Sequence, residues 1–120
     1  MGNLVTPTDS FERKVKRLLK KFPTLSVSLL KLEEELIENP FSGDKLSNNL
    51  YKVRLADKSK GKGKSGGFRV ITYLVKQTGE SIEIFLLTIY DKSEQDTLNS
   101  EEIKYLINEV AVTRRQKRSD

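Results

Sequence analysis

The spacing of apolar residues changes once along the chain, and this change constrains the fold more than any other feature. Before residue 40, apolar side chains recur every three or four positions, which is the spacing of one helix face. Between residues 50 and 90 they recur at every second position, which is the spacing of one strand face. Helices that precede a block of strands are typical of the α+β class, and we expect them to pack on one face of a small antiparallel β-sheet.

Two N-terminal helices follow from the first spacing. Residues 9–22 place their apolar side chains on one face, and Asp9 with Glu12 has the pattern of a capping box. The opposite face of this helix carries six cations: Arg13, Lys14, Lys16, Arg17, Lys20 and Lys21. Residues 25–38 repeat leucine with the same period and carry glutamates outside, so the two helices should form an antiparallel hairpin.

Three strands follow from the second spacing. The alternation predicts strands over residues 50–55, 68–76 and 82–90. Between the last two strands, a hairpin turn should place Gly79 at a positive φ. Residues 3–7 form a short extended lead-in, so the expected order of elements is β-α-α-β-β-β-α.

The remaining segments predict loops, a short helix and a tail. Residues 42–49 are polar, and residues 57–67 are rich in lysine and glycine, so we expect loops that bury nothing. Ser100 begins a short C-terminal helix with acidic residues in its first turn. We therefore expect a single domain over residues 1–113, followed by a basic, disordered tail over residues 114–120.

The composition excludes several classes of chemistry. The chain has no cysteine and no histidine, which removes disulfides, thiol nucleophiles, the usual general base at neutral pH and the commonest metal ligand. Any reaction must use lysine, arginine, tyrosine, hydroxyl or carboxyl groups, and we expect neither a metal nor another cofactor. The sequence contains no apolar run of about 20 residues and no signal-peptide pattern, so a cytoplasmic protein without membrane contact is expected.

The positive charge is concentrated in one central segment. Residues 52–69 carry seven basic side chains against the single carboxylate of Asp57, a balance of +6 that exceeds the +5 of the whole chain. Such clustering is typical of proteins that bind polyanions. A solvated loop that happens to be rich in lysine is the alternative, and charge alone leaves both interpretations open.

The strand alternation predicts which residues share each face of the sheet. If the helices cover one face, that face contains Val53, Leu55, Val70, Leu74, Leu87 and Ile89. The opposite, solvent-facing surface then carries Lys52, Arg54, Arg69, Tyr73, Thr88 and Tyr90, with Lys92 following. We expect no carboxylate on this surface, and cations with phenol rings there suit a phosphate backbone and a stacked base. Protection of sheet edges by lysine and arginine is the alternative.

Three segments of the sequence carry a resemblance to a known family. Residues 50–56, 59–71 and 87–94 resemble the RelE/ParE toxin superfamily, and most closely its HigB-like RelE branch, within a similarity over roughly residues 3–110. The resemblance implies a RelE-like fold and the toxin of a type II toxin–antitoxin system. Such a toxin enters the ribosomal A site and cleaves mRNA. Its partners are the ribosome, mRNA and a cognate antitoxin, and operator DNA is bound only through the antitoxin complex.

The same resemblance assigns roles to individual residues. Lys52 and Arg54 match two basic residues on the family's second strand. Arg69 matches the arginine that contacts the scissile phosphate, and Lys92 matches a basic residue just after the last strand. The family's catalytic tyrosine has no counterpart, since residues 97–99 read Thr-Leu-Asn, and Tyr90 is the candidate to replace it.

The implied reaction is a metal-independent endoribonuclease reaction. The RNA 2′-hydroxyl attacks the adjacent phosphate and yields a 2′,3′-cyclic phosphate. Arginine suits the clamp on the charged phosphorane because it stays charged and binds phosphate with two donors. The catalytic candidates are Arg54, Lys60, Lys64, Arg69, Tyr90 and Lys92. The RNA-binding candidates are Lys52, Lys58, Lys62 and Tyr73.

Two other functions fit parts of the sequence. A ParE-like inhibitor of DNA gyrase would share the fold without this chemistry, although its typical members lack so dense a set of cations. A non-catalytic RNA-binding or ribosome-binding module would share the charge. Product analysis of RNA and a supercoiling assay discriminate among the three.

Overall fold

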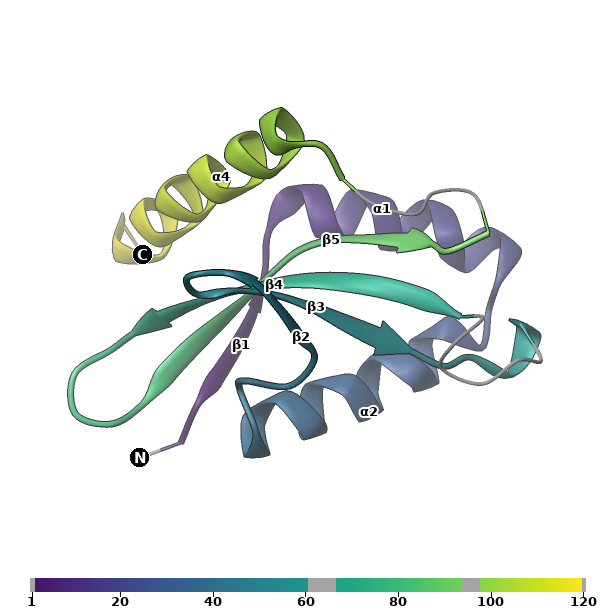
Figure 1. The fold of residues 1–120 in the computed structure, drawn as a ribbon, viewed down its shortest axis with the longest axis horizontal. Helices are drawn as coiled ribbons and strands as arrows, with labels where there is room; N and C mark the ends of the chain where they lie inside the picture. Colours follow the sequence, from purple (N-terminus) through teal and green to yellow (C-terminus); the bar gives the residue numbers. More distant parts are fainter. Residues whose placement is uncertain (1, 61–66, 94–97, 120) are drawn as a thin grey trace.

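A computed structural model describes residues 2–60, 67–93 and 98–119 of the chain, which folds as one five-stranded sheet with helices on both faces (Figure 1). The elements are β1 (Leu4–Pro7), α1 (Asp9–Lys21), α2 (Leu25–Glu38), β2 (Asp44–Ser47), β3 (Leu50–Leu55), the 3-10 turn η1 (Lys58–Lys60), β4 (Phe68–Lys76), β5 (Ile82–Asp91) and α4 (Ser100–Ser119). The α+β class and the two N-terminal helices are confirmed.

The sheet is mixed rather than antiparallel. Its strand order is β1-β5-β4-β3-β2, and β1 runs parallel to β5 while the other neighbours are antiparallel. The strand β2 lies in the polar segment 42–49, where the sequence predicts a loop, and all four of its residues are exposed. Both misassigned features belong to four-residue strands, which are too short to show a clear alternation; β1 pairs with a distant segment, whereas β2 pairs with the strand that follows it. Gly79, by contrast, has φ 77° in the β4–β5 turn, as expected.

The start of α1 is anchored to β5 by Thr8. The Thr8 hydroxyl accepts a hydrogen bond from the Phe11 N–H at 3.3 Å and donates to the Leu86 carbonyl oxygen at 3.0 Å. The cap residue is therefore Thr8 and not Asp9, which is the first helical residue. A buried hydroxyl can accept and donate at once, whereas an ionised carboxylate can only accept.

Two hydrophobic clusters lie on opposite faces of the sheet. The helices α1 and α2 cover one face, and α4 covers part of the other (Figure 1). The cluster under α1 and α2 includes Val53, Leu55, Val70, Leu74, Ile84 and Ile89. The cluster under α4 includes Leu50, Ile71, Phe85, Leu87, Leu106 and Val110. The expectation that the face opposite the N-terminal helices is polar throughout is therefore wrong.

Leu87 lies on the face opposite to the one expected. It packs in the cluster under α4, because the β4–β5 pairing shifts by one residue between Ile71 and Thr72. Their partners are Thr88 and Leu86, so Leu87 is the extra residue of a β-bulge. A bulge shifts the alternation of every residue beyond it. No pattern in the sequence marks its position.

The C-terminal helix is longer than expected. The helix α4 spans twenty residues to Ser119, so residues 114–119 continue the helix rather than form a disordered tail. Leu106 and Val110 hold the helix on the sheet. Within the described residues, no helix is both long and apolar enough to cross a membrane.

Candidate functional site

Three candidate residues form one row across neighbouring strands. Arg54 on β3 pairs with Arg69 on β4, and Arg69 pairs with Tyr90 on β5. The row lies on the sheet face that α4 partly covers, since Tyr90 packs in the cluster under that helix. Register therefore brings together the two arginines expected to clamp a phosphate and the tyrosine expected beside it. Like charges directly opposite each other on a sheet are unfavourable, so the arginine pair costs stability.

The members of the row differ in exposure. Arg54 is exposed, with 57% of its side chain accessible. Arg69 and Tyr90 retain only 5% and 3% of their surface, so the prediction that both face solvent is wrong. Arg69 lies between partners on β3 and β5, and Tyr90 packs in the cluster under α4. Arg54 lies beyond Lys52, the last residue of β3 that pairs with β2. The Arg69 guanidinium donates to the Phe68 carbonyl oxygen at 3.1 Å, which restricts its orientation.

A carboxylate also lies on this face, contrary to expectation. Asp44 on β2 pairs with Lys52, and its carboxylate oxygen is 3.9 Å from a terminal nitrogen of Arg54. The polar sequence of residues 42–49 predicts a loop, and a loop would not place Asp44 on this face. Both side chains of the pair are mostly exposed, and such ion pairs contribute between about 0 and 1 kcal/mol. A phosphate can therefore displace Asp44 from Arg54 at small cost.

Lys92 is exposed and lies beside the row. Its backbone N–H donates to the Gly67 carbonyl oxygen at 3.3 Å, which holds the residue after β5 against the start of β4. Lys58 is exposed in η1. Lys60 belongs to the same turn, but its side chain lies outside the description, as do Lys62 and Lys64 entirely. The roles of these three lysines stay predictions.

Tyr73 does not join the row. It pairs with Leu50 and Phe85, four residue pairs away from Arg69 on the ladder between β3 and β4, and packs against the cluster under α4. Lys52, half-buried opposite Ile71, lies between that register and the row. The structure thus separates the two residues expected to bind RNA on this face, with Lys52 the nearer to the arginines.

Asp57 anchors the first residues of the lysine-rich connection. It is 4% exposed and accepts hydrogen bonds at 2.6 Å from the hydroxyls of Thr24 and Ser28, as well as from Ser59. Burial raises the pKa of Asp57, but the hydrogen bonds from Ser28, Ser59 and Thr24 outweigh it and hold the pKa below its usual value. The expectation that residues 57–67 bury nothing is therefore wrong at their first residue.

Gly67 anchors the other end of the same connection. A Cβ atom at this position would lie 2.1 Å from the Leu55 carbonyl oxygen, a contact that only glycine avoids. Asp57 follows Leu55 by two residues, so both ends of the connection are held at the end of β3. The lysine-bearing segment consequently begins and ends next to Arg54 and Arg69.

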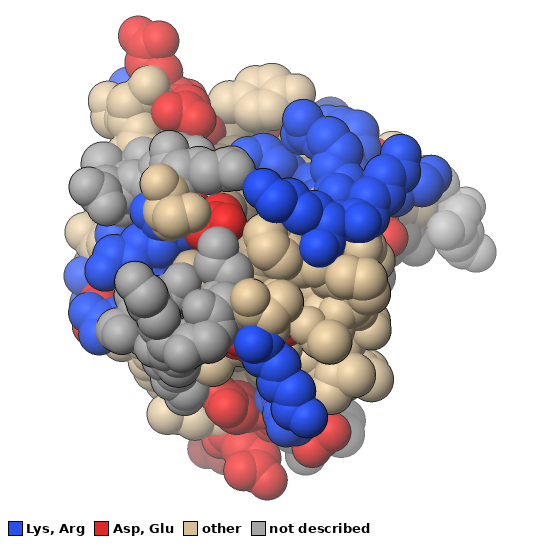
Figure 2. Space-filling model, turned by 90° about the vertical axis from the view of Figure 1, so that its right-hand side faces the viewer, with Lys and Arg blue, Asp and Glu red and all other residues tan. Residues whose placement is uncertain are grey.

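Cations of α1 also border the row, although the strand pattern alone does not place them in the site. Lys14, Arg17 and Lys21 line a hollow of about 240 Å³ together with Tyr90 and Asp91. Figure 2 shows a dense group of Lys and Arg side chains over α1 at this end of the molecule. Their spacing of three and four residues is visible in the sequence, but their position next to β5 is not.

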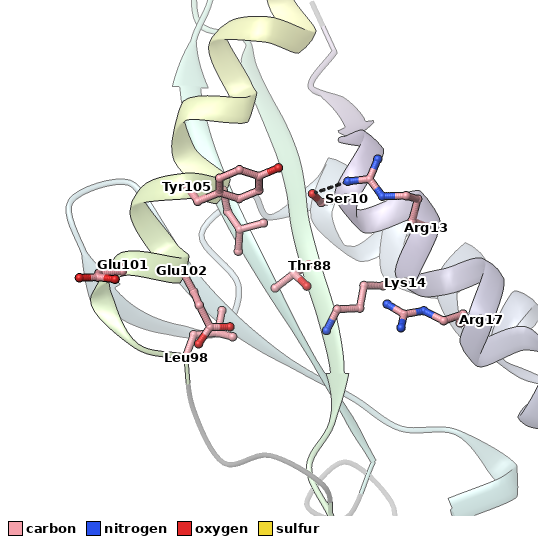
Figure 3. Close-up of a pocket in the computed structure, with 10 residues that line it drawn as sticks. Ser10, Arg13, Lys14, Arg17, Thr88, Leu98, Glu101, Glu102 and Tyr105 are labelled. Carbon is pink, nitrogen blue, oxygen red and sulfur yellow. Dashed lines mark hydrogen bonds between the residues drawn. The ribbon is translucent and has the colours of Figure 1, made fainter.

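A larger cleft of about 430 Å³ opens between α1 and α4 above Thr88 (Figure 3). Its α1 side carries Arg13, Lys14 and Arg17, and its α4 side carries Glu101, Glu102 and the exposed Tyr105. At one end the helices are joined, because the Ser10 hydroxyl donates to Glu109 at 2.9 Å and Arg13 lies 3.9 Å from the same carboxylate. Lys14 and Arg17 line both this cleft and the hollow beside Tyr90.

Comparison with known proteins identifies the fold. No protein-family model matches the sequence. A solved structure of the E. coli toxin RelE, a double arginine-to-alanine mutant in the free state, superposes with a TM-score of 0.54 at 17% sequence identity. The match covers 90% of this chain and 97% of the RelE chain. At this identity the likeness establishes the RelE-like fold, and the two chains share it over almost their whole lengths.

Proposed function

We propose that the chain is the toxin of a type II toxin–antitoxin system and cleaves mRNA on the ribosome, in the cytoplasm. The observation that carries the proposal is the cross-strand row of Arg54, Arg69 and Tyr90 on a RelE-like fold. Two arginines side by side, one of them held by its surroundings, suit a group that carries two negative oxygens. A phosphodiester that gains charge as it reacts is such a group.

The proposed reaction needs no external reactant. The 2′-oxygen forms a bond to phosphorus, the bond from phosphorus to the 5′-oxygen breaks, and a 2′,3′-cyclic phosphate remains. Arg69 and Arg54 stabilise the charge that develops on the phosphorane oxygens. A basic group accepts the proton of the 2′-hydroxyl, and an acidic group returns a proton to the leaving 5′-oxygen. Lys92, Lys60 and Lys64 are the candidates for these transfers, and Tyr90 for stacking or donation.

The ribosome and an antitoxin complete the proposal. The row contains no strong general base, so positioning of the RNA by the ribosome contributes much of the rate, and activity on free RNA should be weak. A cognate antitoxin neutralises the exposed cations or displaces an element needed for activity. Operator DNA is contacted only through the complex with the antitoxin.

The direct test is expression in growing cells without a partner, followed by primer extension on translated mRNAs. We expect growth arrest and new 5′ ends within codons, and analysis of the 3′ fragments should show cyclic phosphate. A harmless protein would contradict the toxin assignment. Arrest with intact mRNA and loss of DNA supercoiling would indicate the gyrase inhibitor, and arrest with both intact would indicate a binding module.

Arg69 and Lys58 should separate catalysis from binding. Arg69→Ala should lower the single-turnover cleavage rate on saturated ribosomes by about 100-fold or more, as for the loss of one preorganised donor. Lys58→Ala removes an exposed point charge. It should instead reduce the slope of log affinity against log salt concentration by about 0.7 for the one contact that is lost. A saturated rate that survives Arg69→Ala and is abolished by Lys58→Ala would reverse this division of roles.

A further inference from the structure

The geometry points to a second RNA contact on α1: a stripe of three cations that binds the phosphodiester backbone beside the Arg54–Arg69–Tyr90 row. The stripe consists of Lys14, Arg17 and Lys21. The inference rests on the proposed function, because the RNA that reaches the stripe is the RNA that reaches the row or the ribosomal RNA around it.

Continuity of the surface is the first argument. All three cations line the hollow that also contains Tyr90, the last member of the row. The strand β1 pairs with β5 only as far as Leu86, so α1 lies beside the remainder of β5 (Figure 1). The stripe therefore borders the β5 end of the row, where Tyr90 reaches the same hollow.

Charge is the second argument. Among the described residues, none of Lys14, Arg17 and Lys21 has a carboxylate oxygen within 4.0 Å of its charged nitrogens. Arg13, on the same helix, does have one in Glu109. Asp91 also lines the hollow, where it accepts hydrogen bonds from the backbone and hydroxyl of Ser93. The charge of the stripe therefore stays available to a ligand, as does that of Lys16 and Lys20, but only the stripe lines the hollow beside the row. Lys21 also lies 5.4 Å from the centroid of the Phe22 ring.

Dimensions are the third argument. Residues 14 and 21 are two helical turns apart, which is about 10 Å along the helix axis. Phosphates of one strand in a duplex recur about every 3.4 Å, so this length faces about three of them. Figure 3 shows Lys14 and Arg17 on the α1 side of the cleft that opens toward α4. A strand that passes over Tyr90 can therefore continue along the stripe into this cleft.

The test compares two variants that lose equal charge. The stripe variant carries Lys14→Gln, Arg17→Gln and Lys21→Gln. The matched variant carries Lys16→Gln, Lys20→Gln and Lys31→Gln, which are exposed positions on α1 and α2 outside the lining of both clefts. Glutamine has a helix propensity close to that of lysine and arginine, so both variants should fold. Thermal unfolding checks this.

The measurement is the salt dependence of binding to two probes. One probe is a labelled twelve-nucleotide single-stranded RNA methylated at its 2′-oxygens, which cannot be cut, and the other is a ribosome carrying mRNA with an empty A site. Three contacts at about 0.7 each predict that the stripe variant lowers the slope of log affinity against log salt by about 2. The matched variant should change this slope by less than the value for one contact, which is about 0.7. A charge-retaining variant (Lys14→Arg, Arg17→Lys, Lys21→Arg) should keep the wild-type slope.

The outcomes distinguish mRNA from ribosomal RNA as the source of the phosphates. They also distinguish failure of this inference from failure of the proposed function. A smaller slope on both probes assigns the stripe to the strand that is cut, and a smaller slope on ribosomes alone assigns it to ribosomal RNA. Equal slopes for the stripe and matched variants, with wild-type protein that still cleaves mRNA, overturn this inference and leave the proposed function standing. A wild-type protein that neither binds nor cleaves RNA overturns both.

Discussion

Replacement of Asp57 tests how the base of the lysine-rich connection is held. The carboxylate accepts three hydroxyl hydrogen bonds, from Thr24, Ser28 and Ser59, and one from the Ser59 backbone, and it is almost fully buried. A hydrogen bond to a charged group contributes about 1.5–3 kcal/mol, but the contributions share one desolvation cost and do not add. We expect Asp57→Ala to lower the free energy of unfolding by about 3 kcal/mol. Asp57→Asn keeps an acceptor, so we expect about half of that.

The contribution of Asp57 to the free energy of unfolding should also depend on pH. The pKa of Asp57 is lowered by folding, so its stabilisation is complete above the unfolded value of about 3.9 and is lost as the pH falls through the folded value. Urea denaturation at pH 7, 5, 4 and 3 measures the difference between wild type and Asp57→Asn. We expect this difference to be constant from pH 7 to 5 and to shrink below pH 4. A cost below about 0.5 kcal/mol at pH 7, or a difference independent of pH, would refute the reasoning.

Two further substitutions test the packing around the site. Gly67→Ala should lower the free energy of unfolding, measured by thermal denaturation, by about 1–3 kcal/mol or more, because the added Cβ atom meets the Leu55 carbonyl oxygen. Gly2→Ala is the control: its Cβ atom meets no atom, so the stability should not change. Leu106→Ala should lower the free energy of unfolding by about 2–5 kcal/mol, because it leaves a cavity in the cluster under α4. Tyr105 has 63% of its surface exposed, so Tyr105→Ala should lower the free energy of unfolding by less than about 1 kcal/mol. Equal losses of stability would contradict the observed orientation of α4.

Local pattern was enough for the main elements of this chain. The helix period placed α1 and α2, the strand period placed β3, β4 and β5, and Gly79 marked the turn between the last two. These features depend on residues a few positions apart, because the apolar face of each helix or strand is formed by residues of that element alone. The same alternation put Arg54, Arg69 and Tyr90 on one face, and the strand register confirms that they do share it.

Tertiary structure decided what surrounds those three residues. The pairing of β1 with β5 joins segments distant in the sequence. The pairing of β2 with β3 and the bulge at Leu87 are local, but no apolar alternation marks them. All three determine which side chains meet. Arg69 is buried between β3 and β5, and Tyr90 is buried in the cluster under α4. The stripe on α1 borders the row only because β1 ends early. The period of a sequence predicts which residues of one element share a face. Burial and proximity depend on how separate elements pair and pack, and no local period encodes that.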